Sequence, residues 1–125
     1  MYTSLVYSNL FVSTVVMLIL DVGFLSMNAD MFKIQIADVQ HSPLKLNPIG
    51  ALLSYMFLIF GLNYFILSPH RSIVDAFLFG FVIYGVYETT TLALLRKWRF
   101  STVVTDTLWG GILFALTTFI TYKIV

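Results

Sequence analysis

Four long apolar stretches constrain this chain more than any other feature. They cover residues 5–27, 48–67, 73–95 and 102–122. A helix that crosses the hydrocarbon core of a bilayer needs about 20 mostly apolar residues. Inside lipid, a helix satisfies every backbone N–H and C=O group within its own segment. The sequence therefore predicts an all-α integral membrane protein, an antiparallel four-helix bundle formed by a single domain over residues 1–125.

The composition is that of a chain whose solvent is lipid. The sequence is 59% hydrophobic and only 10% charged, whereas a soluble domain carries roughly 25% charged residues. The formal net charge of +1 leaves no basic patch of the kind that nucleic acid requires. The lack of cysteine excludes a disulfide framework and thiol chemistry. This composition makes the lipid bilayer the expected partner. No phosphate-binding loop or cofactor fingerprint occurs, so no cofactor is predicted.

The first span is unusual at both of its ends. The opening MYTSLVYSNLF has no Lys or Arg before its apolar run and no A-x-A-like cleavage site after it. We interpret it as a retained span and not as a signal peptide. Beyond the span, Met27, Met31 and Ile34 keep helical spacing into the long connection over residues 28–47. This spacing fits either a first helix that continues past the membrane or a separate short interfacial helix.

The distribution of Lys and Arg predicts an orientation. One end of the bundle, reached after the first and third spans, has the basic residues Lys33, Lys45, Arg96, Lys97 and Arg99. Only Arg71 and Lys123 lie near the other end. The positive-inside rule then places both basic connections in the cytoplasm and both termini on the non-cytoplasmic side. Trp98, within the segment RKWR, is expected to anchor the chain at the cytoplasmic interface.

Three acidic residues interrupt the apolar spans, and we call Asp21, Glu88 and Asp106 the acid layer. At 1.5 Å per helical residue, Asp21 lies about 9 Å and Glu88 about 10 Å below the cytoplasmic boundary. Asp106 lies about 6 to 9 Å below it on the same scale. Tyr55, in the second span, reaches about the same depth. All four helices therefore deliver polar groups at one level of the membrane.

The helical faces agree with these depths. Tyr84, Glu88 and Thr91 follow one stripe of the third span, with Tyr87 beside it, and Asp106 shares a stripe with Trp109 in the fourth. Polar stripes should turn inward, because lipid offers them no hydrogen-bond partners. The candidate ligand-binding residues are Asp21, Tyr55, Tyr84, Tyr87, Glu88, Thr91, Asp106 and Trp109.

Three ionised acids in the membrane need compensation. At about 2.5 to 3.5 kcal/mol for each charge, they would cost roughly 8 to 10 kcal/mol. Four sources of compensation are compatible with the sequence: protonation, hydrogen bonds from the tyrosines and the Trp109 indole, the Arg96 guanidinium, or a bound cation. An intramembrane group of this cost is by default functional, although a structural polar network that sets helix register is the simpler alternative.

A metal site is not predicted. His41 and His70 lie in connections without the spacing of zinc ligands. An oxygen-only site that combines the acid layer with a carbonyl group would suit Mg²⁺ or Ca²⁺, but the spacing does not demand one.

The spacing of these residues resembles a known family. The motifs LD at the end of the first span, YGxYExTxLAxxxxW in the third and TDxxWG in the fourth are similar to those of the domain-of-unknown-function 2177 family. The matching residues are Leu20, Asp21, Tyr84, Gly85, Tyr87, Thr90, Leu92, Ala93, Trp98, Thr105, Asp106, Trp109 and Gly110. The family usually has Asp-Leu-Thr-Asn where this chain has Glu88-Thr89-Thr90-Thr91. The resemblance implies a small four-span membrane protein with its site at these motifs, and it implies no reaction.

Three function classes remain open from the sequence. The first is a protein whose acid layer binds a small polar or cationic ligand, or relays protons, near the cytoplasmic side. The second is an enzyme that acts on a lipid-borne substrate with one protonated and one ionised acid. The third is a membrane scaffold without a ligand. Four helices leave little room for a pore, so transport would require a homo-oligomer.

Overall fold

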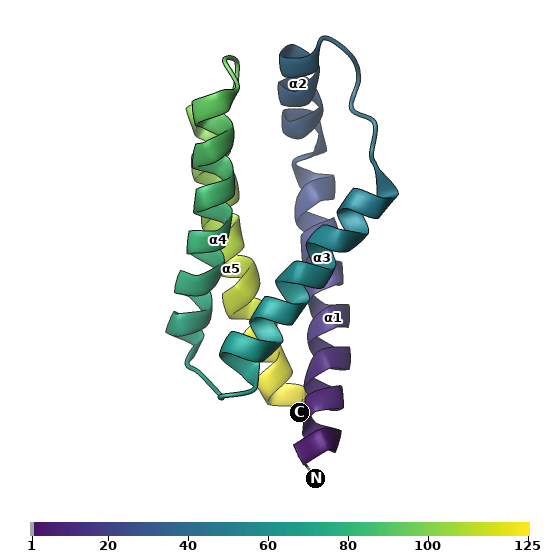
Figure 1. Ribbon diagram of the computed structural model, residues 1–125, viewed down its shortest axis with the longest axis vertical. Coiled ribbons are helices and arrows are strands. Elements are labelled where there is room, and N and C mark those ends of the chain that lie inside the picture. The colour runs from purple at the N-terminus through teal and green to yellow at the C-terminus, as the bar shows by residue number, and fades with distance from the viewer. Residues whose placement is uncertain (1) are drawn as a thin grey trace.

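The computed structural model describes residues 2–125, and every regular element in this range is a helix (Figure 1). The elements are α1 (Tyr2–Met27), α2 (Ala29–Gln40), α3 (Pro48–Leu62), the π-helix η1 (Asn63–Leu67), α4 (Ile73–Leu94) and α5 (Phe100–Ile124). Four segments are long and apolar enough to cross a membrane: Thr3–Met27, Pro48–Leu67, Ile73–Leu94 and Phe100–Ile124. The predicted all-α membrane bundle is confirmed, and each of the four predicted spans corresponds to one of these candidate segments.

The loop sequences explain where the helices begin and end. The Asn47 side chain accepts hydrogen bonds from the backbone N–H groups of Ile49 (3.0 Å) and Gly50 (3.2 Å), and Pro48 occupies the first turn of α3. Ser72 caps α4 in the same way by accepting from the Asp75 N–H at 3.0 Å. These caps fix the points at which the second and third spans enter the bundle.

The long connection contains a separate helix. Asn28, with φ −112° and ψ 18°, interrupts α1, and α2 then continues in nearly the same direction (Figure 1). The segment therefore forms a helix separate from α1, as in the second alternative, and this helix continues along the direction of α1, as in the first. His41 ends α2 in the left-handed conformation, with φ 58°. Helix α2 lies beside the loop that joins α4 to α5, at the end of the molecule opposite both termini (Figure 1).

Helices α4 and α5 form the most closely packed pair, and α1 packs against α5. The close approach of α4 to α5 depends on Gly80 and Gly110. A Cβ atom at Gly80 would meet the Gly110 carbonyl oxygen, and a Cβ at Gly110 would meet the Tyr84 side chain. Helix α3 instead crosses α1 obliquely on the outside of the bundle (Figure 1).

Candidate functional site

The three members of the acid layer are all buried. Their exposed fractions are 6% for Asp21 on α1, 1% for Glu88 on α4 and 8% for Asp106 on α5. Acidic side chains are almost never this buried unless they are paired. The identity of their partners therefore decides what the layer can do.

Asp21 joins three helices. Its Oδ2 accepts a hydrogen bond from the Tyr55 hydroxyl of α3 at 2.5 Å, and its Oδ1 accepts from the Trp109 Nε1–H of α5 at 2.9 Å. Phe24 stacks on the Trp109 ring with the centroids 4.5 Å apart, which holds the indole against α1. Both donors are neutral, so the Asp21 carboxyl group gains hydrogen bonds but no opposite charge.

Glu88 and Asp106 form a second group. The Trp98 Nε1–H donates to Glu88 Oε1 at 2.8 Å. The Asp106 carboxyl group is within hydrogen-bonding reach of Glu88 and interacts electrostatically with Asp21. Two carboxyl groups can hydrogen-bond to one another only when one of them carries a proton. A hydrogen bond between Glu88 and Asp106 would therefore require a proton on one of the two carboxyl groups.

The structure contradicts one expectation about the segment RKWR, the interfacial anchor, and one of the four alternatives for compensation, the Arg96 guanidinium. Trp98 does not anchor the chain at the interface: it is only 7% exposed, and its indole turns inward to Glu88. Arg96 is exposed and forms no ion pair within residues 2–125. The chain reverses direction after Leu94, and this reversal brings Trp98 back over the end of α4. Only the family motif, which ends at this tryptophan, could have indicated its role.

Three predicted residues lie outside this hydrogen-bond network. The Tyr84 ring packs over Gly110, and the residue lies near Asp21 and Asp106 without a hydrogen bond to either. Tyr87 is 62% exposed. The Thr91 hydroxyl donates to the Tyr87 carbonyl oxygen of its own helix at 2.7 Å. Within the stripe along α4, Glu88 is buried, whereas Tyr84 and Thr91 are partly buried.

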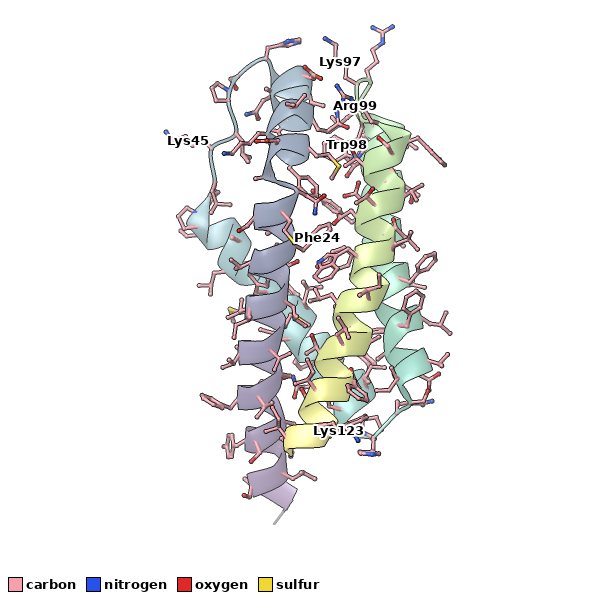
Figure 2. The ribbon with its side chains drawn as sticks, turned by 180° about the vertical axis from the view of Figure 1, so that it is seen from behind. Phe24, Lys45, Lys97, Trp98, Arg99 and Lys123 are labelled. Carbon is pink, nitrogen blue, oxygen red and sulfur yellow. The ribbon has the colours of Figure 1, made fainter. Side chains whose placement is uncertain are left out.

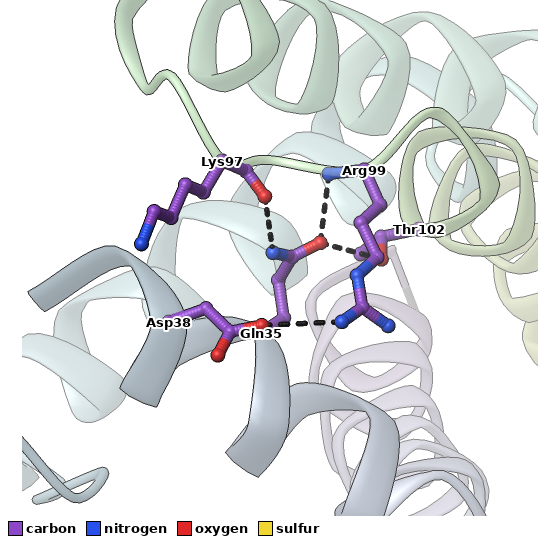
Figure 3. Close-up of polar contacts among 5 residues, drawn as sticks. All are labelled: Gln35, Asp38, Lys97, Arg99 and Thr102. Atoms are coloured by element: carbon purple, nitrogen blue, oxygen red, sulfur yellow. Dashed lines mark hydrogen bonds and ion pairs between the residues drawn. The ribbon is translucent and has the colours of Figure 1, made fainter. Parts of the chain in front are cut away.

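Gln35 on α2 is a residue that the sequence analysis missed. It is fully buried, and its Nε2 donates to the Lys97 carbonyl oxygen at 2.7 Å (Figure 3). Its Oε1 accepts from the Arg99 N–H at 2.8 Å and from the Thr102 hydroxyl at 3.0 Å. This contact clamps α2 onto the loop that holds Trp98, and the Asp38–Arg99 ion pair at 3.1 Å lies beside it. A single glutamine in a connection has no sequence pattern that would reveal it.

No cationic side chain compensates the acid layer in the described part of the chain. The ion pairs within residues 2–125 are Arg71–Asp75 at 3.9 Å and Arg99–Asp38 at 3.1 Å, and both lie in or beside connections. Residues 2–125 also contain no group of three His, Asp or Glu side chains arranged to hold a metal ion. The acid layer is thus divided into Asp21 with its two donors and the Glu88–Asp106 pair.

Comparison with known proteins agrees with the membrane fold. No curated protein and no solved structure is significantly similar to the chain. A family model described as "Predicted membrane protein (DUF2177)" matches residues 6–123, which is nearly the whole chain and includes every motif residue above. The chain belongs to this family of membrane proteins.

Proposed function

We propose that the acid layer binds and releases protons, and that a small cation can take the place of a proton there. One observation supports this proposal above all others. The hydrogen-bond donors to Asp21 and Glu88 are a phenol and two indoles, all neutral, although each acid is at least nine-tenths buried.

A purely structural network of buried acids would be expected to contain a lysine or arginine, because an uncompensated charge in a membrane costs several kcal/mol, on the order of 3. Neutral donors lower this cost but do not remove the charge. The charge must therefore be balanced by something that arrives from outside the chain, and a proton or a small cation is the simplest candidate. Carboxyl groups inside membrane proteins have this role in proton relays.

Each residue has a distinct role in the proposed site. Glu88 and Asp106 share the exchangeable proton, and Trp98 orients the Glu88 carboxyl group. Asp21 is held in one rotamer by Tyr55 and Trp109 and adds negative potential beside Asp106. The site lies below the loop that Gln35 clamps, so exchange from that end would pass Trp98.

The chain has an internal reporter for this proposal. It contains two tryptophans, and each donates its indole N–H to one acid of the layer. In the Trp109→Phe variant, emission comes from Trp98 alone, and we expect it to change with pH in a single transition. We expect Glu88→Gln in that background to fold, because the amide oxygen still accepts from Trp98, and to abolish the transition. Fluorescence of the purified protein in detergent measures both.

The controls separate proton binding from structure. Asp75→Asn, which removes an acid that pairs with Arg71 at the edge of α4, should leave the transition unchanged. A fixed concentration of Na⁺, Mg²⁺ or a small primary amine should displace the transition if a cation competes with the proton. Emission that stays constant with pH while the parent protein remains folded would instead support the structural network and overturn the proposal.

We further propose that the end of the molecule with α2 faces the cytoplasm. Lys45, Lys97 and Arg99 lie at this end, whereas Lys123 lies at the other (Figure 2). Because the chain has no cysteine, single cysteines can report the orientation. We expect Thr3→Cys to react with a membrane-impermeant maleimide on intact cells and Lys45→Cys to react only after permeabilisation. The reverse pattern would invert the orientation and leave the proton-binding proposal intact.

A further inference from the structure

A groove of about 750 Å³ runs between α1 and α3, away from the Glu88–Asp106 pair. Its volume lies within the range of about 300 to 1,000 Å³ that is typical of small-molecule sites. Its walls are mainly apolar and include Leu10, Met56, Ile59 and Phe60. No Asp, Glu, Lys or Arg lines it. Since both helices are membrane spans, lipid is the medium that meets this groove.

Two asparagines lie near one end of the groove, which Val6 and Ser68 complete, and they make this end polar. Asn9 is only 7% exposed, lines the groove and has no hydrogen-bond partner in the described part of the chain. Asn63, opposite it, uses its Nδ2 for the Ser13 hydroxyl at 3.0 Å and the Ile59 carbonyl at 2.9 Å, which leaves its Oδ1 as an acceptor. A buried polar group without a hydrogen-bond partner is destabilising, so a ligand that bonds to Asn9 would be favoured at this position.

The backbone at this end has an unusual form. Asn63 begins the π-helix η1, and π-helical turns occur frequently at functional sites. The widened turn accompanies an Asn63 side chain that points to α1, where it meets Ser13. The opposite end of the groove has no free polar group of this kind, because the Tyr55 hydroxyl already donates to Asp21.

The groove is polar at one end and apolar along its walls, and a lipid in one leaflet likewise has a polar head group and an apolar chain. Asn9 lies about 9 Å from the start of its span, in the half of the bundle that contains both termini. From Asn63 to Tyr55 the groove extends for about 12 Å toward the other half. A head group at the asparagines would therefore have its chain directed toward the middle of the membrane.

We infer that the groove binds an uncharged long-chain lipid with a hydroxyl head group. The ligand hydroxyl donates to Asn63 Oδ1 and accepts from the Asn9 amide, and the chain lies along Met56, Ile59 and Phe60. A carboxylate or phosphate head group fits less well, because no cation lines the groove to compensate its charge. This inference does not depend on proton binding by the acid layer.

Photolabelling of the full chain in phosphatidylcholine nanodiscs tests the inference. The probe is a long-chain primary alcohol with a diazirine in its chain, compared with the fatty acid of equal length. We expect saturable labelling of α1 and α3 by the alcohol, stronger than by the acid. Asn9→Leu should reduce labelling by the alcohol by about two- to tenfold, which corresponds to the loss of one hydrogen bond. This variant should fold, because Asn9 has no partner to lose in the described chain.

A matched pair on α3 provides the control. Met56→Trp fills the groove and should abolish labelling, whereas Phe57→Trp, at a neighbouring position that is 75% exposed and does not line the groove, should leave it unchanged. Equal labelling by alcohol and acid, or labelling that survives both Asn9→Leu and Met56→Trp, would show that the groove makes only non-specific contact with lipid. If photolabelling instead produces cross-linked dimers that Met56→Trp abolishes, then a second copy of this chain occupies the groove. Either of these two results overturns the inference.

Discussion

Replacing Gly80 with alanine is expected to force α4 away from α5 and to lower the stability of the whole bundle. The new Cβ atom would lie 2.7 Å from Phe114 Cγ and 2.8 Å from its Cβ, and closer still to the Gly110 carbonyl oxygen. The carbonyl belongs to the backbone of α5 and cannot rotate away, so the helices themselves must separate. Overpacking of a well-packed core costs typically about 1 to 3 kcal/mol, and a backbone clash belongs at the upper end.

This separation also affects the acid layer. Glu88 lies on α4 and Asp106 on α5, so the same displacement would separate the two carboxyl groups that we propose share a proton. We expect Gly80→Ala to lose the pH-dependent Trp98 emission as well as stability. Thermal unfolding in detergent, followed by circular dichroism, measures the first effect, and the fluorescence titration measures the second.

Gly23→Ala is the matched control. Gly23 lies in α1, and a Cβ there would meet nothing within 4 Å. We expect this variant to unfold at the parent temperature or slightly above it, because alanine favours the helix. If Gly80→Ala and Gly23→Ala unfold at the same temperature, then the α4–α5 interface is looser than its contacts indicate.

Gln35→Leu is expected to release α2 from the loop between α4 and α5. The substitution removes three hydrogen bonds and leaves the Lys97 carbonyl and the Arg99 N–H without their partner. At about 1 kcal/mol for each bond, the expected loss of stability is roughly 2 to 3 kcal/mol, since water can reach part of the freed loop. Trp98, which lies between Lys97 and Arg99, should then become accessible to an aqueous quencher such as iodide.

Gln40→Leu serves as the control on the same helix. Gln40 is exposed and bonds only to the Ser42 and Pro43 carbonyl oxygens nearby. We expect this change to alter neither the unfolding temperature nor the quenching of Trp98. Quenching that rises equally in both variants would show that α2 does not depend on the Gln35 clamp.

Much of the architecture was predictable because it depends on local properties of the chain. Apolar length alone identifies the spans, and the helical rise alone brings Asp21, Glu88 and Asp106 to one depth. The burial of all three agrees with the further rule that polar groups turn away from lipid. Even the break at Asn28 was one of two alternatives that the spacing of Met27, Met31 and Ile34 allowed.

The sequence by itself determined which segments are helices and that the chain is a membrane protein, and it predicted one common depth for the three acids. Only the tertiary structure decided the partners: Asp21 with Tyr55 and Trp109, Glu88 with Trp98 and Asp106, and Gln35 with the loop. Hydropathy and helical period describe one segment at a time. The rotation of each helix about its axis and the choice of its neighbours depend on side chains that meet across tens of residues, such as Gly80 against Gly110, and no local pattern records them.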